Sequence, residues 1–303
     1  MFLTKTQRTV LFSLSLAFIL IITACSNSST PPPSQGNDAT PPPPPPPARE
    51  ITVVSREASS GTRGAFDELM HIRVNNEDLL YAEAVIREST DSVAAAVEVD
   101  RYAIGYTSLG SLNDAIRAID VDGVSPTVAN VKSGEYAVAR PFIFATLGEA
   151  EGIAADFLAF ASSAEGQEIV AASGLIVSFD DAAPYELPSP ALSGNLSLGG
   201  STSVERVVER LKDAYSSLNP EIVFEIQYVG SGAGIRDATN GVVEIALSSR
   251  DLTAAELEVL TPVVFANDGI AIIVNTQNPV QGLTSEQVTG IFTGEIRTWD
   301  IVE

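Results

Sequence analysis

Two segments rich in glycine and serine constrain the fold of this chain most strongly, because each follows an apolar run and precedes a helical pattern. The first, at 56–62, reads Arg-Glu-Ala-Ser-Ser-Gly-Thr. The second, at 199–203, reads Gly-Gly-Ser-Thr-Ser, and a companion at 230–234 reads Gly-Ser-Gly-Ala-Gly. Free backbone N–H groups and the positive end of the helix dipole attract anions at a helix N-terminus. The sequence therefore predicts loops that form an oxyanion-binding cleft.

The segments around these loops alternate between strand and helix patterns. Val204, Val207, Leu211 and Tyr215 recur at helical spacing, whereas 222–228 has the pattern of a strand. Such alternation predicts α/β layers with largely parallel sheets. Further strands are expected at 51–54, 196–198 and 244–248, and a further helix at 64–70.

Two extended apolar segments, 136–145 and 262–274, lack helical periodicity and are long enough to cross between two lobes. We expect them to be hinge strands. The stretch 177–195 contains Pro184, Pro188 and Pro190 and is predicted to be a surface connector. The cleft is therefore expected between two lobes that two hinge strands join.

Composition excludes some classes of partner. At 303 residues, with 45% hydrophobic and 18% charged residues, the chain is long enough for two globular domains. Its formal net charge is -22, and binding to a nucleic-acid backbone relies on clusters of Lys and Arg, so we expect no nucleic-acid partner. The single histidine, His71, has no Cys or His companion nearby, and we expect neither a metal nor a cofactor.

The first 24 residues are predicted to be a lipoprotein signal peptide. Lys5 and Arg8 precede an apolar run at 10–22, and 22–25 reads Ile-Thr-Ala-Cys, which resembles a lipobox. Cys25, the only cysteine, is then the lipidated N-terminus; the alternative is an uncleaved anchor with an incidental cysteine. Residues 25–49 are expected to be a lipid-anchored linker, because their prolines favour a semi-rigid polyproline II spacer.

Six stretches carry a more specific signal. They are ITVVSREASSGTRGAF at 51–66, AIGYTSLGSL at 103–112, VDGVSPTVANVKSGEYAVARPFIF at 121–144, LSLGGSTSVERVVERL at 196–211, YVGSGAGI at 228–235 and DGIAIIVNTQNPVQGLTSEQVTGIFTGEIRTW at 268–299. They resemble the phosphate-binding proteins of bacterial ABC phosphate transporters, the PstS type, across nearly all of 50–303. The resemblance implies a two-lobed type II periplasmic-binding-protein fold of the α/β class, with the ligand cleft between the lobes.

The resembling halves stand in the reverse of the family's order, in which the half containing LSLGGSTS comes first. We therefore expect a circular permutant, which chains tolerate when the old termini lie close together and the new ends open in an exposed loop. What we call the Arg56 lobe is then assembled from 50–141 and 266–303. What we call the Ser201 lobe is continuous over 142–265 and includes the connector 177–195.

The resemblance also implies the ligands of a phosphate site. Phosphate is a small tetrahedral dianion near neutral pH, so a dehydrated site needs many short donors and a fixed cation such as the planar guanidinium of an arginine. By residue-for-residue match, the Arg56 lobe contributes Arg56, Ser60, Gly61 and Thr62, and the Ser201 lobe contributes Ser201, Thr202, Ser203, Ser231 and Ser249. Taken alone, a Ser-Gly-Thr sequence is more commonly a helix N-cap.

Ser249 departs from the family's pattern. Members often carry an aspartate there, which accepts a proton from phosphate and repels fully ionised sulfate, whereas a serine hydroxyl serves either anion. We expect Ser249 to be a weaker ligand. Arg63 and Arg250 are either cleft cations or partners of nearby acids.

The function implied by the resemblance is that of an extracytoplasmic, lipid-anchored, monomeric binding protein that captures inorganic phosphate for an ABC permease. The sequence shows no nucleophile that a histidine could activate and no cluster of metal ligands, so it does not favour an enzyme. The alternative is a phosphate-sensing or adhesive surface lipoprotein that does not dock on a permease, because the permutation moves the anchor to the other lobe.

Overall fold

The computed structural model describes residues 49–75 and 77–301. The predicted signal peptide, Cys25 and nearly all of the predicted linker lie outside the described residues. None of the helices in the described part of the chain has the length and apolar character that a membrane span requires.

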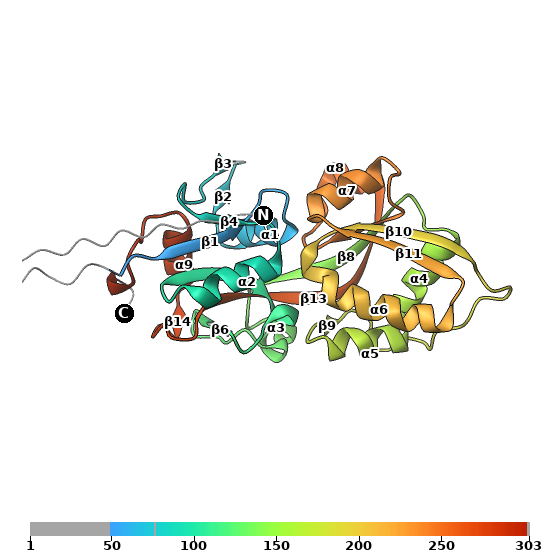
Figure 1. Ribbon diagram of the computed structural model, residues 1–303, viewed down its shortest axis with the longest axis horizontal. Coiled ribbons are helices and arrows are strands. Elements are labelled where there is room, and N and C mark those ends of the chain that lie inside the picture. The colour runs from blue at the N-terminus through green and yellow to red at the C-terminus, as the bar shows by residue number, and fades with distance from the viewer. Residues whose placement is uncertain (1–48, 76, 302–303) are drawn as a thin grey trace, which may run out of the picture. The chain divides into compact units, whose positions relative to one another are not determined.

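Helices and strands alternate along most of the chain (Figure 1). The helices are α1 (Gly61–Leu69), α2 (Thr90–Val99), α3 (Val128–Ser133), α4 (Gly152–Ser162), α5 (Ala164–Ala172), α6 (Glu205–Leu218), α7 (Ser231–Thr239), α8 (Ala254–Leu257) and α9 (Ser285–Phe292), with 3₁₀ turns η1 (Leu109–Ser111), η2 (Thr202–Val204) and η3 (Trp299–Ile301). The strands are β1 (Thr52–Arg56), β2 (Arg73–Val74), β3 (Glu77–Asp78), β4 (Val85–Arg87), β5 (Ala103–Ser108), β6 (Ile116–Ala118), β7 (Asp120–Val121), β8 (Ala139–Leu147), β9 (Ile176–Val177), β10 (Gly194–Gly200), β11 (Ile222–Tyr228), β12 (Ile245–Ser248), β13 (Leu260–Asn275) and β14 (Gly282–Leu283). The predicted α/β class is confirmed.

The main sheet has the strand order β11, β10, β12, β8, β13, β5, β1, β4. Its two flanks are parallel, because β10 pairs in parallel with β11 and β12, and β1 pairs in parallel with β4 and β5. The two central strands, β8 and β13, run antiparallel to their neighbours. The predicted parallel sheets are therefore confirmed for the flanks, whereas the centre of the sheet is antiparallel.

Strands β8 and β13, which we call the crossing strands, link the two flanks of the sheet. The first part of β13 pairs with β8 as far as Gly269, and the part from Ile270 to Val274 pairs with β5. Figure 1 shows both strands running from one group of elements to the other. Extended structure was predicted here at 136–145 and 262–274, within three residues of the observed bounds; that these strands act as hinges stays a prediction.

Two separate aromatic clusters form the centres of the two main hydrophobic cores. In the Arg56 lobe, Phe66 of α1 stacks on Tyr106 with ring centroids 4.1 Å apart, and Phe292 packs against both rings. In the Ser201 lobe, Phe157 packs edge-on against Tyr215. Burying one such side chain stabilises the fold by about 1.5–3 kcal/mol. These cores hold α1, which carries Phe66, and α6, which carries Tyr215, in place.

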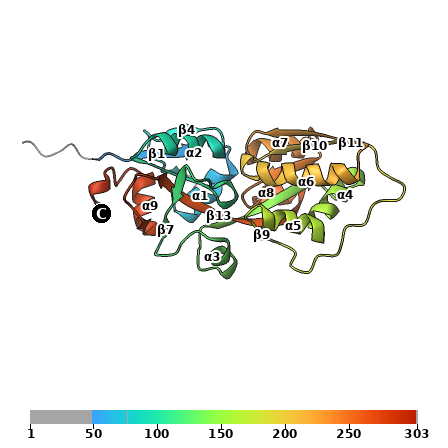
Figure 2. The same cartoon turned by 60° about the horizontal axis from the view of Figure 1, so that its bottom comes forward.

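The predicted connector has neither helix nor strand between Val177 and Gly194. Its Tyr185 hydroxyl donates to Asp156 at 2.6 Å, and its backbone N–H donates to Glu165 at 2.8 Å. Figure 2 shows this segment running along the outside of α4 and α5. The connector is therefore attached to the Ser201 lobe without adding to the sheet.

The two ends of the described chain lie beside each other. Glu50 and Thr298 form an antiparallel bridge, and the backbone N–H of Trp299 donates to the carbonyl of Arg49 at 3.0 Å. The Trp299 ring is buried, and its Nε1 donates to the carbonyl of Tyr102 at 3.0 Å. The chain therefore enters and leaves the described fold at one place in the Arg56 lobe.

Candidate functional site

Four helical N-termini meet between the two lobes. Helices α1 and α2 belong to the Arg56 lobe, whereas α7 and η2, which continues into α6, belong to the Ser201 lobe. Each follows a strand from the parallel flanks, so all four begin at the carboxyl ends of strands, where α/β sheets bind ligands. The first N–H groups of a helix have no partner within the helix. The meeting point therefore concentrates backbone donors.

Small hydroxyl residues start three of these helical segments. The Oγ of Ser60 accepts from the N–H of Arg63 at 3.3 Å, and the Oγ of Ser201 accepts from the N–H of Ser203 at 3.2 Å. Ser89 caps α2 by accepting from the N–H of Ser92 at 3.1 Å. Such caps compensate for the polar residues' low helix propensity, which is why helices begin at these loops.

Arg56 is a buried cation beside the hydroxyl residues, with 1% of its surface exposed. Its Nε and Nη2 each donate to a carboxylate oxygen of Glu57 at 2.9 Å, and its Nη1 donates to Thr90 Oγ1 at 3.2 Å. Its backbone is also held, because its N–H donates to the Tyr106 hydroxyl and its carbonyl accepts from Arg63. The guanidinium is therefore fixed beside the hydroxyl groups described next.

Hydroxyl groups from the two lobes contact one another directly. Thr62 Oγ1 lies 2.6 Å from Ser203 Oγ, and Ser203 Oγ lies 3.0 Å from Thr90 Oγ1. Thr90 Oγ1 also lies 3.2 Å from Thr202 Oγ1, and the backbone N–H of Thr90 donates to the same atom. This hydroxyl cluster joins the first turns of α1, α2 and η2.

Three serines of the Ser201 lobe form the adjoining side of the cluster. Ser201 Oγ donates to Ser249 Oγ at 2.8 Å, and the backbone N–H of Ser249 donates to Ser231 Oγ at 3.1 Å. All three side chains are buried. Ser249 therefore lies within the cluster and contributes a neutral hydroxyl to it.

Gly61 lies against these serines from the opposite lobe. A Cβ atom at this position would come within 2.1 Å of Ser231 Oγ and within 2.8 Å of Ser249 Oγ. Real Cβ atoms do not approach so closely, so only glycine allows the start of α1 to reach the Ser201 lobe. The contact brings the first N–H groups of α1 to the serines.

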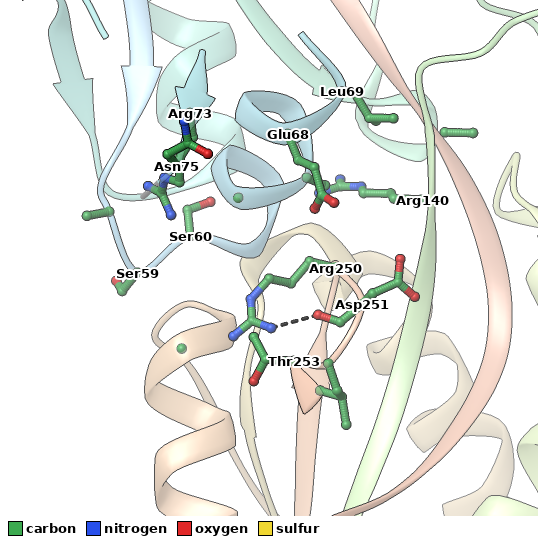
Figure 3. Close-up of a pocket in the computed structure, with 16 residues that line it drawn as sticks. Ser59, Ser60, Glu68, Leu69, Arg73, Asn75, Arg140, Arg250, Asp251 and Thr253 are labelled. Atoms are coloured by element: carbon green, nitrogen blue, oxygen red, sulfur yellow. Dashed lines mark hydrogen bonds between the residues drawn. The ribbon is translucent and has the colours of Figure 1, made fainter. Parts of the chain in front are cut away.

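The structure thus brings together eight of the nine residues predicted for the site, by hydrogen bonds or, for Gly61, by close approach. Arg56 and Thr202 are joined to the set through Thr90, whereas within the described residues no hydrogen bond joins Ser60 to Thr90 or to another member of the set. Ser60 caps α1 and lines a neighbouring cavity of about 1050 Å³ between α1 and the loop at 250–253 (Figure 3).

Arg63 and Arg250 are engaged with acidic side chains. Arg63 donates to Asp67 at 3.2 Å and to Asp78 at 2.5 Å, and Arg250 donates to both carboxylate oxygens of Glu256 at 2.8 Å. The alternative of structural pairing is therefore confirmed for both. Arg250 also lines the cavity in Figure 3, where it donates to the carbonyl of Asp251.

Two residues of the site were not predicted from the sequence, Thr90 and Glu57. Thr90 follows the cap Ser89 at the start of an apolar helix, and this Ser-Thr signal resembles those at 60–62 and 201–203. Glu57 is the carboxylate bonded to Arg56, and it directly follows the predicted arginine in the sequence. Both signals were present, but neither residue stands out without its spatial neighbours.

The arrangement suits a small, multiply charged oxyanion. It supplies hydroxyls and helix N-termini from both lobes around the buried guanidinium of Arg56, and charge-assisted bonds to such groups are about twice as strong as neutral ones. No group of three or more His, Cys, Asp and Glu residues that could hold a metal ion occurs in the part of the chain that the structure describes.

Comparison with known proteins identifies a family. A sequence model of the PBP superfamily domain matches residues 34–165 and 187–301. The phosphate-binding protein PstS 2 of Streptococcus pneumoniae serotype 4 is 38% identical over 257 residues, which cover 84% of this chain and 88% of that protein. The phosphate-binding protein PstS of Pseudomonas aeruginosa is 30% identical over 146 residues, 43% of this chain and 45% of that protein.

A solved structure shares the fold. The crystal structure of a phosphate-binding protein of a phosphate ABC transporter from Streptococcus pneumoniae superposes with a TM-score of 0.69 at 37% sequence identity. The match covers 84% of this chain and 100% of that one. The similarity therefore extends through both lobes.

Proposed function

Because the chain belongs to the PstS phosphate-binding proteins of the PBP superfamily, we propose that it captures inorganic phosphate outside the cytoplasm for an ABC importer. The observation that carries this proposal is the hydroxyl cluster, in which two lobes place the starts of four helical segments beside the buried Arg56. The protein is a binding module in this proposal, and it performs no chemical step on its ligand.

The cluster provides a shell of suitable donors for phosphate. Arg56 supplies the fixed positive charge, while Thr62, Ser203 and Thr90 supply hydroxyls from both lobes. Gly61 lets the α1 N-terminus approach, so that backbone N–H groups complete the shell. Ser201, Thr202, Ser231 and Ser249 bind from the Ser201 lobe, and Ser60 contributes at the edge facing the cavity.

We expect this shell of donors to discriminate only weakly between phosphate and sulfate. A carboxylate at position 249 would accept a bond from protonated phosphate and repel sulfate, whereas the Ser249 hydroxyl can donate to either anion. The carboxylate bonded within the site is instead Glu57, and both of its oxygens accept from Arg56. We therefore propose that phosphate is preferred over sulfate by a smaller factor than in relatives with the aspartate.

The remaining parts of the proposal concern anchoring and delivery. Lipidation of Cys25 holds the protein at the membrane surface, and the proline-rich linker of residues 25–49 spaces the fold from it. The bound phosphate passes to an ABC permease that contacts both lobes of a single, monomeric chain.

The competing function is a surface lipoprotein that senses phosphate, or adheres through this fold, without docking on a permease. It is favoured by the place where the linker reaches the fold, since Arg49 pairs with Asp300 of the Arg56 lobe. Both functions use the same phosphate site.

Phosphate uptake by whole cells separates the two functions. In cells starved of phosphate and expressing no other binding protein, deleting this protein should abolish high-affinity uptake, and restoring it should return uptake. Unchanged uptake by the deletion strain would exclude the transport function and leave the sensing function.

We also propose that the chain is a circular permutant, together with its streptococcal relative. The match to that relative covers 84% of this chain and 88% of that protein, as expected if the two share the order of segments. The match to the Pseudomonas aeruginosa protein covers only 43% and 45%, as expected if only one half aligns in sequence order. A chain rearranged to begin at residue 194 and to continue from 303 into 49 should fold and bind phosphate equally well.

A further inference from the structure

The crossing strands carry a buried ion pair outside the predicted ligand set. Arg140 of β8 donates through Nε and Nη2 to Asp268 Oδ2 of β13, at 3.1 and 2.9 Å. Their side chains are 1% and 0% exposed, the deepest burial of any ion pair in the described part of the chain. The guanidinium also lies over the ring of Phe142, 5.2 Å from its centroid.

Each partner of this pair reaches a different lobe. Asp268 Oδ1 accepts from Ser108 Oγ at 2.8 Å and from the backbone N–H of Leu109 at 3.1 Å, both in the Arg56 lobe. Arg140 Nη1 donates to the carbonyl of Ser249 at 3.2 Å, in the Ser201 lobe. The pair is thus a continuous hydrogen-bonded link from one lobe to the other through the crossing strands.

The lobe contact of Arg140 falls on a residue of the hydroxyl cluster. Ser249 donates its backbone N–H to Ser231 Oγ and accepts from Ser201 at its own Oγ. Its carbonyl is the remaining polar group, and Arg140 fixes it. With all three groups engaged, the orientation of the Ser249 side chain depends on the guanidinium behind it.

Fold stability alone gives a weak reason for such a pair. Burial lowers the pKa of Arg140 and raises the pKa of Asp268, which shows that the charged forms are costly here. Buried ion pairs can commonly be replaced by apolar groups of similar volume at no loss of stability. Because the pair is hydrogen-bonded to both lobes and to Ser249, it can also fix the position of Ser249 relative to the two lobes.

We propose that Arg140 and Asp268 are positioning residues for anion capture: Asp268 orients Arg140 from the Arg56 lobe, and Arg140 holds Ser249 in its binding geometry. This inference rests on the proposed function, because it concerns how the phosphate site is held. Neither residue touches the ligand. The pair makes the geometry of Ser249 depend on contacts that span both lobes.

The neutral double variant Arg140→Met/Asp268→Asn tests the proposal. It removes both charges together, so no buried charge is left unpaired, and the amide oxygen of the introduced asparagine can still accept from Ser108 and Leu109. We expect cooperative unfolding close to that of wild type and a phosphate Kd raised roughly tenfold, the effect of one lost buried hydrogen bond. The matched control Arg117→Met, whose arginine bonds only within the Arg56 lobe, should leave the Kd unchanged.

A mutant cycle with Ser249→Ala distinguishes positioning from general damage. If Arg140 acts through Ser249, then Ser249→Ala should weaken binding in the wild-type background and have almost no further effect in the neutral double variant. Thr90→Ala, which removes a hydroxyl that does not contact Arg140, should instead weaken binding by the same factor in both backgrounds.

A conservative variant provides a second test in case the double variant does not fold. Arg140→Lys retains the charge for Asp268, but a single ammonium cannot reproduce the guanidinium fork that reaches both Asp268 and Ser249. It should fold and still bind phosphate more weakly than wild type.

Failure of the positioning role and failure of the proposed function would give different results. Wild-type affinity in the neutral double variant, or an equal loss from Ser249→Ala in both backgrounds, would overturn the positioning role while leaving phosphate capture intact. A wild-type protein that binds no phosphate would overturn the proposed function first, and the role of the pair with it.

Discussion

The hydroxyl of Thr62 in the Arg56 lobe lies 2.6 Å from the hydroxyl of Ser203 in the Ser201 lobe, although 141 residues separate them in the sequence. This contact, with those of Thr90 to Thr202 and Ser203, holds the two lobes together at the site. An entering phosphate would replace such neutral bonds with charge-assisted ones, which are roughly twice as strong. Ligand binding and lobe contact are therefore linked at the same atoms.

Gly61→Ala should abolish tight phosphate binding. The added Cβ meets Ser231 Oγ at 2.1 Å, so the start of α1 can no longer reach the Ser201 lobe. Gly64→Ala is the matched control in the same helix, since its Cβ would meet only the flexible Arg250 side chain, at 3.2 Å. Titration of both variants with phosphate, alongside circular dichroism, checks the prediction; equal affinity of the two would contradict it.

Arg56→Ala should weaken phosphate binding by at least about 100-fold, because it leaves a buried dianion without its fixed countercharge. The exposed Arg236→Ala on α7 is the control for loss of one positive charge, and it should bind like wild type. Equilibrium dialysis with labelled phosphate measures both. An Arg56→Ala protein with unchanged affinity would show that the site lies elsewhere.

Asp67 should make stability fall as pH rises from about 4 to 6. Burial, opposed by Arg63 and Arg73, raises the pKa of this carboxyl from 3.8 to about 6, and its Oδ1 has no hydrogen-bond partner among the described residues. Between these two values the folded chain keeps a proton that the unfolded chain has lost, so the unfolded state gains in relative stability with increasing pH.

Asp67→Asn removes this titration. Its free energy of unfolding relative to wild type should therefore increase by about 2 to 3 kcal/mol between pH 4 and pH 7. Urea unfolding across this range measures the difference, with the exposed Asp213→Asn as the control. A constant difference between Asp67→Asn and wild type would be inconsistent with the raised pKa.

Ser249→Asp should raise the preference for phosphate over sulfate by about tenfold or more, because a carboxylate repels fully ionised sulfate and accepts a bond from protonated phosphate. Ser249→Asn adds similar bulk without charge and should not raise it. Competition between the two anions gives the ratio for each variant. Identical ratios for Asp and Asn would mean that charge at this position does not set selectivity.

Cys25→Ser should prevent lipidation and leave the precursor unprocessed or released from the membrane. Labelling with a radioactive fatty acid and cell fractionation measure this, and Ser26→Ala should remain labelled. A labelled Cys25→Ser protein would rule out the anchor.

Local sequence patterns predicted which helices and strands form better than they predicted the residues at which these elements begin. Strand β11 covers the predicted 222–228, whereas α1 begins at Gly61 rather than at 64. The difference arises because Ser60 caps the helix, so residues with low helix propensity form its first turn. Apolar periodicity alone cannot detect such a turn.

Short motifs and a family resemblance predicted most of the site residues. The sequence did not show which residues far apart in the chain contact one another. Thr90 lies 112 residues from Thr202, and Arg140 lies 128 residues from Asp268. The latter two are single opposite charges within apolar runs, a pattern that signals burial but not the identity of the partner. The three-dimensional fold was needed to pair them.

We expect the two lobes to form one phosphate site, and calorimetric titration of the purified protein with phosphate, using sulfate as the comparison, is the direct measurement of such a site. We expect saturable binding of one phosphate per chain, with sulfate bound more weakly. A folded protein that releases no heat of binding with phosphate, and whose unfolding temperature phosphate does not raise, would contradict it.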